Sequence, residues 1–143
     1  MTDKILLGVK PDLIKVVERA LELSPVRFRV TEGLRSLERQ KMLFDARKSK
    51  TMNSRHITGD AVDVVALKGR GQVSWVLEDY YPIAKAFAQA SHELTVPIRW
   101  GGCWQVLSLD TNPETAIKAY ASECAKRGKK PLVDAVHFEL PEF

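Results

Sequence analysis

The sequence predicts an α+β fold, and three observations lead to that class. Segments with helical periodicity and segments with the alternation of strands are mixed along the chain without a regular strand–helix–strand order. The chain has 143 residues, enough for one domain with a real core, and no repeat, low-complexity tract or linker divides it. Its hydrophobic fraction of 45% and charged fraction of 28% are typical of a soluble globular protein. We therefore expect a single domain over residues 1–143.

The first elements along the chain are predicted to be a helix over 11–23 and a strand over 26–33. Pro11 suits the first turn of the helix, and a Ser-Pro pair at 24–25 ends it. Apolar and polar residues alternate through 26–33, as in a strand with one buried face. The apolar face of the helix is expected to consist of Leu13, Val16, Val17, Ala20 and Leu21.

A second helix is predicted over 36–49, with Ser36 as its N-cap. The residue three positions later is Arg39, so the Glu or Gln of a capping box is absent. We expect the inward-facing side chains of this helix to be Leu37, Met42, Leu43 and Ala46.

The rest of the chain is predicted to mix strands and helices irregularly. Tyr81-Pro82 indicates that the helix containing it truly starts later than its pattern does. Asn112 is a suitable N-cap for the last helix, which Pro113 opens and Gly128 ends. The expected elements are strands over 61–66, 96–100 and 136–140 and helices over 75–94 and 112–128.

The net charge of +4 is spread unevenly. Residues 35–55 contain seven basic residues, Lys50 among them, against two acidic ones, and a second basic cluster lies at 126–130. One interpretation is a solubilising surface. The other is attraction to a polyanion, which can be nucleic acid, anionic lipid or an anionic cell-wall polymer. Charge alone does not choose among these.

Nothing in the sequence predicts export or membrane insertion. The apolar run at 5–9 is too short to span a bilayer, and it lacks the length and cleavage site of a secretory signal. We therefore expect a protein that is made in the cytoplasm and has no export route of its own. In that compartment Cys103 and Cys124, which do not form a CxxC pair, are expected to be free thiols.

Asp63 needs a special explanation, because it interrupts the apolar strand predicted over 61–66. A carboxylate is rarely buried unless it is paired or binds a metal. Two of the three histidines have a carboxylate nearby in sequence: His56 precedes Asp63 by seven residues, and His137 follows Asp134 by three. His92 has no such neighbour, and we expect it to be a surface or packed residue.

Both pairs converge only if the chain bends. In an unbroken strand His56 and Asp63 would face opposite sides, since their separation is odd. Gly59 permits the positive φ of a turn that folds His56 back beside Asp63. Asp134 and His137 likewise need a turn or bend over 134–136.

Two imidazoles and one carboxylate are a ligand set suited to zinc, with a fourth position left for water. Zinc lowers the pKa of such a water and polarises a carbonyl as a Lewis acid. Asp134 is then the candidate general base. The alternative for each histidine taken alone is a hydrogen-bonded core residue, which is the commoner role of a histidine in a half-apolar strand.

Four stretches together carry the motifs of one known family: FRVTEGLRSLERQ (28–40), SKTMNSRHITGDAVDVV (49–65), RWGGCW (99–104) and DAVHFEL (134–140). They resemble the zinc peptidases of peptidoglycan, which include D-alanyl-D-alanine carboxypeptidases and phage L-alanyl-D-glutamate endolysins. The most specific piece is SxHxxGxAxD, which runs from Ser54 to Asp63. The match extends in order from about Pro11 to the last residue, so it covers nearly the whole chain.

The resemblance implies a small antiparallel sheet flanked by helices, the fold shared by D-alanyl-D-alanine peptidases and hedgehog proteins. It implies a zinc ion bound by His56, Asp63 and His137, with Asp134 as the catalytic base.

The resemblance also implies roles in substrate binding. Arg35 resembles the arginine that holds the substrate and stabilises the oxyanion, a task for which a guanidinium is well suited. The alternative for Arg35 is a surface cation at a helix start. Ser54 and Gln40 resemble residues that line the substrate cleft, and the alternative for Gln40 is a solvated helix position.

The chain departs from the family pattern at Cys103, where the family often has a polar or acidic residue. Trp100 and Trp104 either form a wall of the cleft or belong to the core. Glu139 either orients a metal ligand or faces solvent, and it is not chosen as the base. Residues 106–133 are longer than in the shortest members, and we expect this helical stretch to shape specificity.

The chain is therefore predicted to be a bacteriophage endolysin, a zinc-dependent hydrolase that cleaves the L-alanyl-D-glutamate bond of the peptidoglycan stem peptide and lyses the host. Three features favour this over a D-alanyl-D-alanine carboxypeptidase: the segments before and around SRHITG resemble phage endolysins, and we expect neither a signal peptide nor an anchor. We also expect no separate wall-binding module, as is typical of endolysins that act on Gram-negative hosts. We expect a monomer that does not insert into membranes. It would stay in the host cytoplasm until a holin releases it, and would then act on the wall in the periplasm.

Two alternatives belong to other classes of protein. A zinc-containing domain that binds the cell wall without cutting it would be indicated by loss of the base, but Asp134 is present. Nucleic-acid binding through the basic residues lacks any recognised motif, and we expect no nucleic-acid partner.

Overall fold

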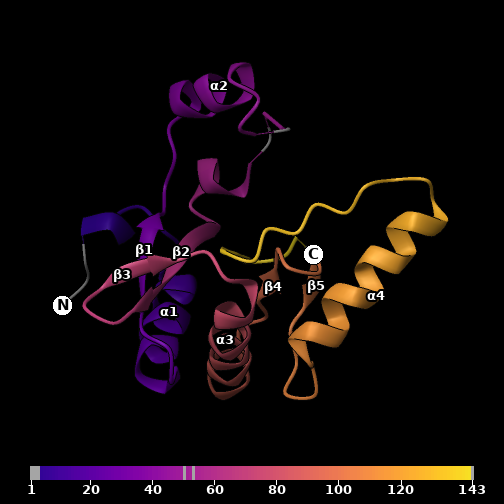
Figure 1. Ribbon diagram of the computed structural model, residues 1–143. Helices are drawn as coiled ribbons and strands as arrows, with labels where there is room; N and C mark the ends of the chain where they lie inside the picture. Colours follow the sequence, from indigo (N-terminus) through magenta and orange to yellow (C-terminus); the bar gives the residue numbers. More distant parts are fainter. Residues whose placement is uncertain (1–3, 50, 53, 143) are drawn as a thin grey trace.

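A computed structural model describes residues 4–49, 51–52 and 54–142, and it has the α+β architecture predicted from the sequence (Figure 1). Its six strands form one sheet in the order β1-β2-β6-β4-β5, with β3 paired to β2, and every pair is antiparallel. The helices are α1 (Pro11–Leu23), α2 (Leu37–Asp45), α3 (Tyr80–Leu94) and α4 (Pro113–Lys126), with short 3-10 turns η1 (Lys4–Leu6), η2 (Arg55–Thr58) and η3 (Leu77–Asp79). The strands are β1 (Phe28–Glu32), β2 (Ala61–Lys68), β3 (Gln72–Ser74), β4 (Arg99–Trp100), β5 (Gln105–Val106) and β6 (His137–Glu139).

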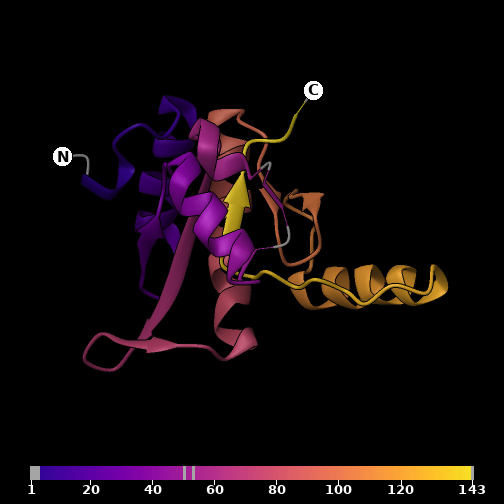
Figure 2. The same cartoon turned by 90° about the horizontal axis from the view of Figure 1, so that it is seen from above.

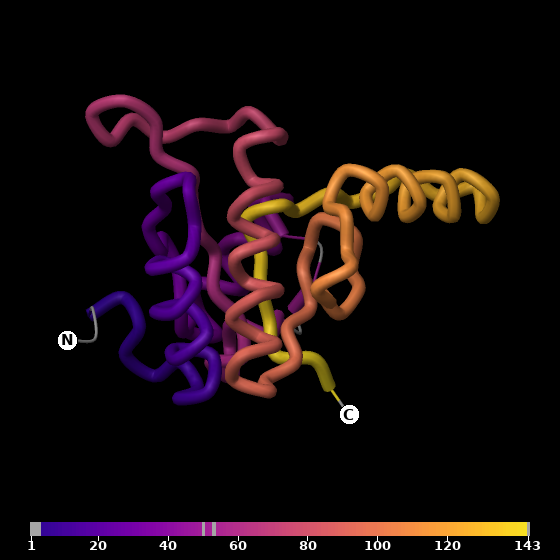
Figure 3. The backbone as a smooth tube through the Cα atoms, turned by 90° about the horizontal axis from the view of Figure 1, so that it is seen from below, coloured from indigo at the N-terminus to yellow at the C-terminus, as the bar shows by residue number. Residues whose placement is uncertain are grey.

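Helices α1 and α3 lie side by side and cover one face of the sheet (Figures 1 and 3). Between them and the strands lies the hydrophobic core, in which the ring of Phe87 from α3 stacks on that of Phe138 from β6 at 3.8 Å. Burying a side chain of this size stabilises the fold by about 1.5–3 kcal/mol. The core therefore fixes β6 against α3, and with it the side chains on the other face of β6.

The opposite face of the sheet carries the polar residues. Side chains alternate along a strand, so the buried Val62 and Val64 of β2 face the core while Asp63 between them faces away. The same rule separates Phe138 from its neighbours His137 and Glu139 in β6. Helix α2 stands on this side of the sheet, apart from α1 and α3 (Figure 1). Helix α4 extends away from the rest of the molecule (Figure 2).

The helix starts predicted from the sequence are confirmed. The side-chain oxygen of Ser36 accepts a hydrogen bond from the Arg39 amide, and that of Asn112 accepts one from the Thr115 amide. Helix α3 begins at Tyr80, after the turn η3, which agrees with the late start that Tyr81-Pro82 indicates. Both cysteines are free thiols, as expected.

The predicted inward face of the second helix is wrong for three of its four residues, and only Leu43 is half-buried. Leu37 and Met42 are 61% and 66% exposed and Ala46 is also exposed, while Gln40 is the buried residue of α2. The reason is the position of α2, which does not pack on the apolar core and points its buried side toward polar groups of the site. The helix also ends at Asp45 instead of residue 49, and Arg47 follows with a positive φ of 60°.

Other boundaries also differ from the predictions. Leu21 of α1 is 44% exposed, β4 is only two residues long, and β6 begins at His137 because the two residues before it form a turn. The strands β3 and β5 are not predicted, because three and two residues are too few to show the alternation of a strand. Lys50 of the predicted basic stretch lies outside the described residues.

Among the helices that the structure describes, none is long and apolar enough to cross a membrane.

Candidate metal centre

Strand pairing places two carboxylates and one imidazole in a row across three strands of the sheet. Glu32 of β1 is the cross-strand partner of Asp63 in β2, and Asp63 is the partner of His137 in β6. Directly opposed residues in an antiparallel pair project their side chains to the same face. Since that face lies away from the α1–α3 layer, the row faces the side on which α2 stands.

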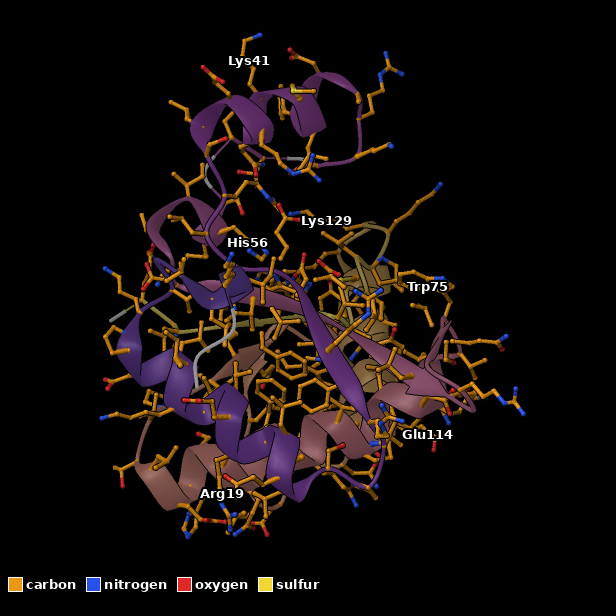
Figure 4. All side chains as sticks on the ribbon, turned by 90° about the vertical axis from the view of Figure 1, so that its left-hand side faces the viewer. Arg19, Lys41, His56, Trp75, Glu114 and Lys129 are labelled. Carbon is orange, nitrogen blue, oxygen red and sulfur yellow. The ribbon has the colours of Figure 1, made fainter. Side chains whose placement is uncertain are left out.

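His56 joins the row through the turn predicted at Gly59. Gly59 has a φ of 75°, and a Cβ at this position would lie against the carbonyl oxygen of Gly8. Only glycine fits both conditions. Ser54 caps the short turn η2 by accepting a hydrogen bond from the His56 amide at 3.2 Å. As a result His56 Nε2 lies 3.1 Å from Asp63 Oδ1, and Figure 4 shows His56 between α2 and the sheet.

The predicted turn between Asp134 and His137 is also present. The amide of His137 donates to the carbonyl oxygen of Asp134 at 3.1 Å, and the Asp134 amide donates to the Gly101 carbonyl at 2.9 Å. A Cβ on Gly101 would press on Asp134 and on His137, whose Cβ would be 2.9 Å away. Gly101, directly after β4, therefore gives room for Asp134 to turn toward the same site as His137.

Hydrogen bonds from behind fix the orientation of both imidazoles. His56 Nδ1 donates to the carbonyl oxygen of Gly33 at 2.9 Å, which leaves Nε2 directed at Asp63. His137 Nε2 donates to Glu139 Oε1 at 2.7 Å, which leaves Nδ1 directed at Asp63 Oδ1, 3.2 Å away. Such outer acceptors set the tautomer of metal-binding histidines and make them better ligands.

The three inner atoms fit a metal ion. His56 Nε2, Asp63 and His137 Nδ1 offer ligand atoms that all lie within 4.8 Å of one another. Ligands at about 2.0–2.1 Å from zinc in a tetrahedral site are separated by about 3.3 Å. The two separations from Asp63 Oδ1, at 3.1 and 3.2 Å, are close to that value. Two nitrogens and one carboxylate oxygen also match the ligand chemistry of catalytic zinc sites.

The charges at this group favour its ionised form in the metal-free protein. Burial opposes ionisation of Asp63, but hydrogen bonds from His137 and His56 outweigh it and hold the pKa of the carboxyl well below its usual range. Burial likewise lowers the pKa of His137, but the bonds to Asp63 and Glu139 raise it to about 9. A proton on His137 thus occupies the place that a cation would take.

Asp134 lies in the same pocket without a fixed partner. Among the described residues, no side-chain hydrogen bond involves its carboxylate. Burial raises the pKa of Asp134 above its ordinary value, and the negative charge of Asp63 raises it further. A raised pKa and an open carboxylate are properties that a general base requires.

Arg35 is a buried residue of the site, 9% exposed, and not a surface cation. Its Nε donates to Glu32 at 2.7 Å and its Nη1 to Gln40 Oε1 at 2.7 Å, while Nη2 is 3.8 Å from Asp63 Oδ2. Ser54 Oγ accepts from Nη1 at 3.5 Å. The guanidinium is therefore held beside the Asp63 carboxylate at several points.

Gln40 lies behind Arg35 and not in the cleft wall. Its side chain is fully buried, and its amide nitrogen donates to Ser49 Oγ and to the carbonyl oxygen of Thr51. Gln40 is therefore neither a solvated helix residue nor part of the cleft lining, the two positions expected for it from the sequence. Gln40 connects Arg35 to the segment after α2.

A single pocket of about 870 Å³ contains these groups. Trp104 belongs to its wall and lies 5.4 Å from the His137 ring, whereas Trp100 is fully buried in the core, as is the thiol of Cys103 beside it. Leu132, from the segment after α4, also lines the pocket, so part of residues 106–133 reaches the site. The pocket is lined by Arg35, Ser54 and Asp134 and by the candidate metal ligands His56, Asp63 and His137. Its rim also includes Lys48, Arg55, Arg99 and Glu142.

Three residues of the site were not assigned from the sequence. The sequence offers Glu139 two roles, and the structure decides between them: its buried carboxylate contacts His137 and does not face solvent. Its position two residues after His137 in a strand was the available signal, since it places both on one face. Glu32 and Arg99 enter through strand register, which the sequence pattern does not contain.

An α+β fold with a His–Asp–His group, an open carboxylate and a buried arginine in one pocket defines a metal-dependent hydrolase. The family model described as phage L-alanyl-D-glutamate peptidase matches residues 2–140. The chain is 39% identical over 112 residues to the L-alanyl-D-glutamate peptidase of Escherichia phage T5, covering 72% of this chain and 77% of that protein. It also resembles the crystal structure of the L-Ala D-Glu endopeptidase ChiX of Serratia marcescens, with a TM-score of 0.74 and 38% identity over 96% of this chain and 84% of that one. The chain belongs to the phage L-alanyl-D-glutamate peptidase family.

Proposed function

We propose that the protein is a zinc-dependent endolysin that hydrolyses the L-alanyl-D-glutamate bond of the peptidoglycan stem peptide. The observation that carries this proposal is the convergence of His56, Asp63 and His137 with the open carboxylate of Asp134 in one pocket. Family membership supports the choice of bond, since the relatives in phage T5 and in Serratia are named for it.

Zinc is the metal that suits the donor set best. His56 Nε2, His137 Nδ1 and the Asp63 carboxylate would hold it, and both imidazoles are fixed in the tautomer that presents a lone pair to the centre. Bound there, zinc supplies Lewis acidity for the scissile carbonyl and lowers the pKa of water.

Asp134 acts as the general base in this proposal. Its carboxylate takes a proton from the attacking water and later gives one to the leaving amine of D-glutamate. The position of Asp134 in the pocket and its raised pKa both support the role, because a carboxylate with a raised pKa accepts a proton more readily than an ordinary one.

Arg35 binds the carbonyl side of the substrate and stabilises the charge that develops on its oxygen. Hydrogen bonds to Glu32 and Gln40 already fix the guanidinium, so its side chain loses little conformational freedom when the substrate binds. Ser54 holds η2 and touches Arg35, and it lines the pocket. Gln40 contributes indirectly, by positioning Arg35.

The biological setting follows the same proposal. A single catalytic domain acting as a monomer would remain in the host cytoplasm until a holin opens the membrane, and would then digest the wall in the periplasm. The basic residues near the pocket, such as Lys48, suit the negative charge of that polymer.

Digestion of purified peptidoglycan tests the proposal. The zinc-loaded protein is expected to create new amino termini on D-glutamate, identified by mass spectrometry, and a chelated sample should create none. Released D-alanine would instead establish a carboxypeptidase. Tight wall binding without any cleavage would establish a binding domain and contradict the proposed hydrolysis.

A further inference from the structure

We infer that Arg99 binds the free α-carboxylate of the D-glutamate residue on the leaving side of the scissile bond. The inference rests on the proposed function and adds a specificity-determining residue to it. In the stem peptide, D-glutamate continues the chain through its side-chain carboxyl, so its α-carboxylate stays ionised on the carbon that bears the scissile nitrogen. An enzyme that cuts this bond therefore meets a negative charge very close to the reacting atoms.

The sheet places Arg99 on the opposite side of the metal centre from Arg35. Arg99 of β4 is the cross-strand partner of Glu139 in β6, and β6 separates β4 from β2. Arg99 Nη1 lies 3.6 Å from the Glu139 carboxylate. Glu139 is hydrogen-bonded to His137, and the other ring nitrogen of His137 is hydrogen-bonded to Asp63. Arg35 contacts the far side of Asp63. A substrate lying across the centre can thus meet one arginine at each end.

The guanidinium of Arg99 is held in place by neighbouring groups and keeps part of its hydrogen-bonding capacity for a ligand. Its Nε donates to the carbonyl oxygen of Trp104 at 3.0 Å, and its central carbon lies 5.3 Å from the centre of the Trp104 ring. Within the described part of the chain, neither terminal nitrogen makes a hydrogen bond. The side chain lines the pocket and is 41% exposed. Nη1 is paired with Glu139 at 3.6 Å, which leaves Nη2 of this planar, pre-positioned cation to bind a carboxylate.

The other arginine on this side of the pocket is already engaged. Arg55 donates to the carbonyl oxygen of Leu140 at 2.7 Å and to Glu142 at 3.1 Å, and it also lies near Asp60. It ties the last residues of the chain to η2. Arg99 is accordingly the arginine on the β4 side with groups left for a ligand.

The test compares two muropeptides that are identical except at D-glutamate, where one has the α-carboxylate and the other an α-amide. The wild-type zinc enzyme should prefer the carboxylate by about 10- to 100-fold in kcat/KM, the range expected for a hydrogen bond to a charged group. In Arg99→Gln the preference should disappear, because cleavage of the carboxylate form falls while cleavage of the amide form changes little. Arg99→Lys keeps the charge without the planar fork, and it should retain a reduced preference.

Arg70→Gln is the matched control, since Arg70 lies in the exposed turn between β2 and β3 and does not line the pocket. It should leave the preference of the wild type unchanged. Equal cleavage of both muropeptides by the wild type, or a full preference in a folded Arg99→Gln or Arg99→Lys variant, would overturn the inference and leave the proposed function standing. Failure of the wild type to cleave either muropeptide or peptidoglycan would overturn both.

Discussion

Replacing Glu139 with glutamine tests whether this buried carboxylate prepares His137 to bind the metal. The substitution keeps the size of the side chain and an oxygen that can accept from His137 Nε2. It removes the negative charge from a bond that is 2.7 Å long and almost shielded from water, since Glu139 is 4% exposed. The expected result is weaker zinc binding in a protein that keeps its fold.

The size of the effect follows from the kind of bond that changes. Hydrogen bonds to charged groups contribute about 1.5–3 kcal/mol and neutral ones about 0.5–1.5 kcal/mol. The difference, about 1–1.5 kcal/mol, corresponds to roughly a tenfold loss of zinc affinity. Replacing the hydrogen-bond acceptor of a metal-binding histidine typically lowers metal affinity by about 10- to 100-fold, and the expected loss lies at the lower end of that range.

Competition against a chelator of known affinity measures the loss. The titration is repeated at several pH values below about 9, the pKa of His137, so that a change in competition from protons is separated from a change in zinc affinity. Glu142→Gln is the control, because this carboxylate lines the same pocket, contacts Arg55 and is 79% exposed. Unchanged zinc affinity in Glu139→Gln would refute the reasoning, as would an equal loss in Glu142→Gln.

Three further outcomes are expected. Asp134→Ala should keep zinc and the fold but lose about 10²- to 10⁴-fold in kcat; near wild-type turnover on peptidoglycan would remove Asp134 from the role of base. Gln40→Leu removes the 2.7 Å acceptor of Arg35 Nη1, while Nη1 keeps only the longer contact to Ser54, and should lower kcat/KM about 10-fold or more at unchanged zinc affinity; unaltered kinetics would show that Arg35 needs no such support. Zinc affinity should rise about tenfold per pH unit up to about pH 9, because zinc needs neutral His137 and displaces its one proton; calorimetry in buffers of different ionisation enthalpy counts that proton, and a pH-independent affinity would contradict the assignment.

Much of the site could be predicted because its determinants are local. Asp63 in an apolar strand requires a partner, Gly59 permits the turn that supplies His56, and the spacing of Asp134 and His137 requires only one more turn. The structure contains both turns. Residue type and short spacing indicated these local turns, whereas the union of both pairs in one site, 74 residues apart in sequence, was given weight by the resemblance to the family.

The parts that escaped prediction depend on contacts between distant segments. The apolar residues of α2 have a helical pattern, but no pattern indicates that this helix stands away from the core and buries Gln40 against Arg35. Likewise, the proximity of Arg99 to Glu139 is set by the register of β4 on β6, which the two-residue strand β4 hardly expresses in sequence.

The most direct test of the central claim is a titration of the metal-free protein with zinc, with the rate of L-alanyl-D-glutamate cleavage measured at each step. The rate should rise in proportion to bound zinc and level off at one equivalent, and His56→Ala should bind less zinc and stay inactive. Full cleavage before zinc is added, or unchanged zinc binding and activity in His56→Ala, would contradict a catalytic metal at His56, Asp63 and His137.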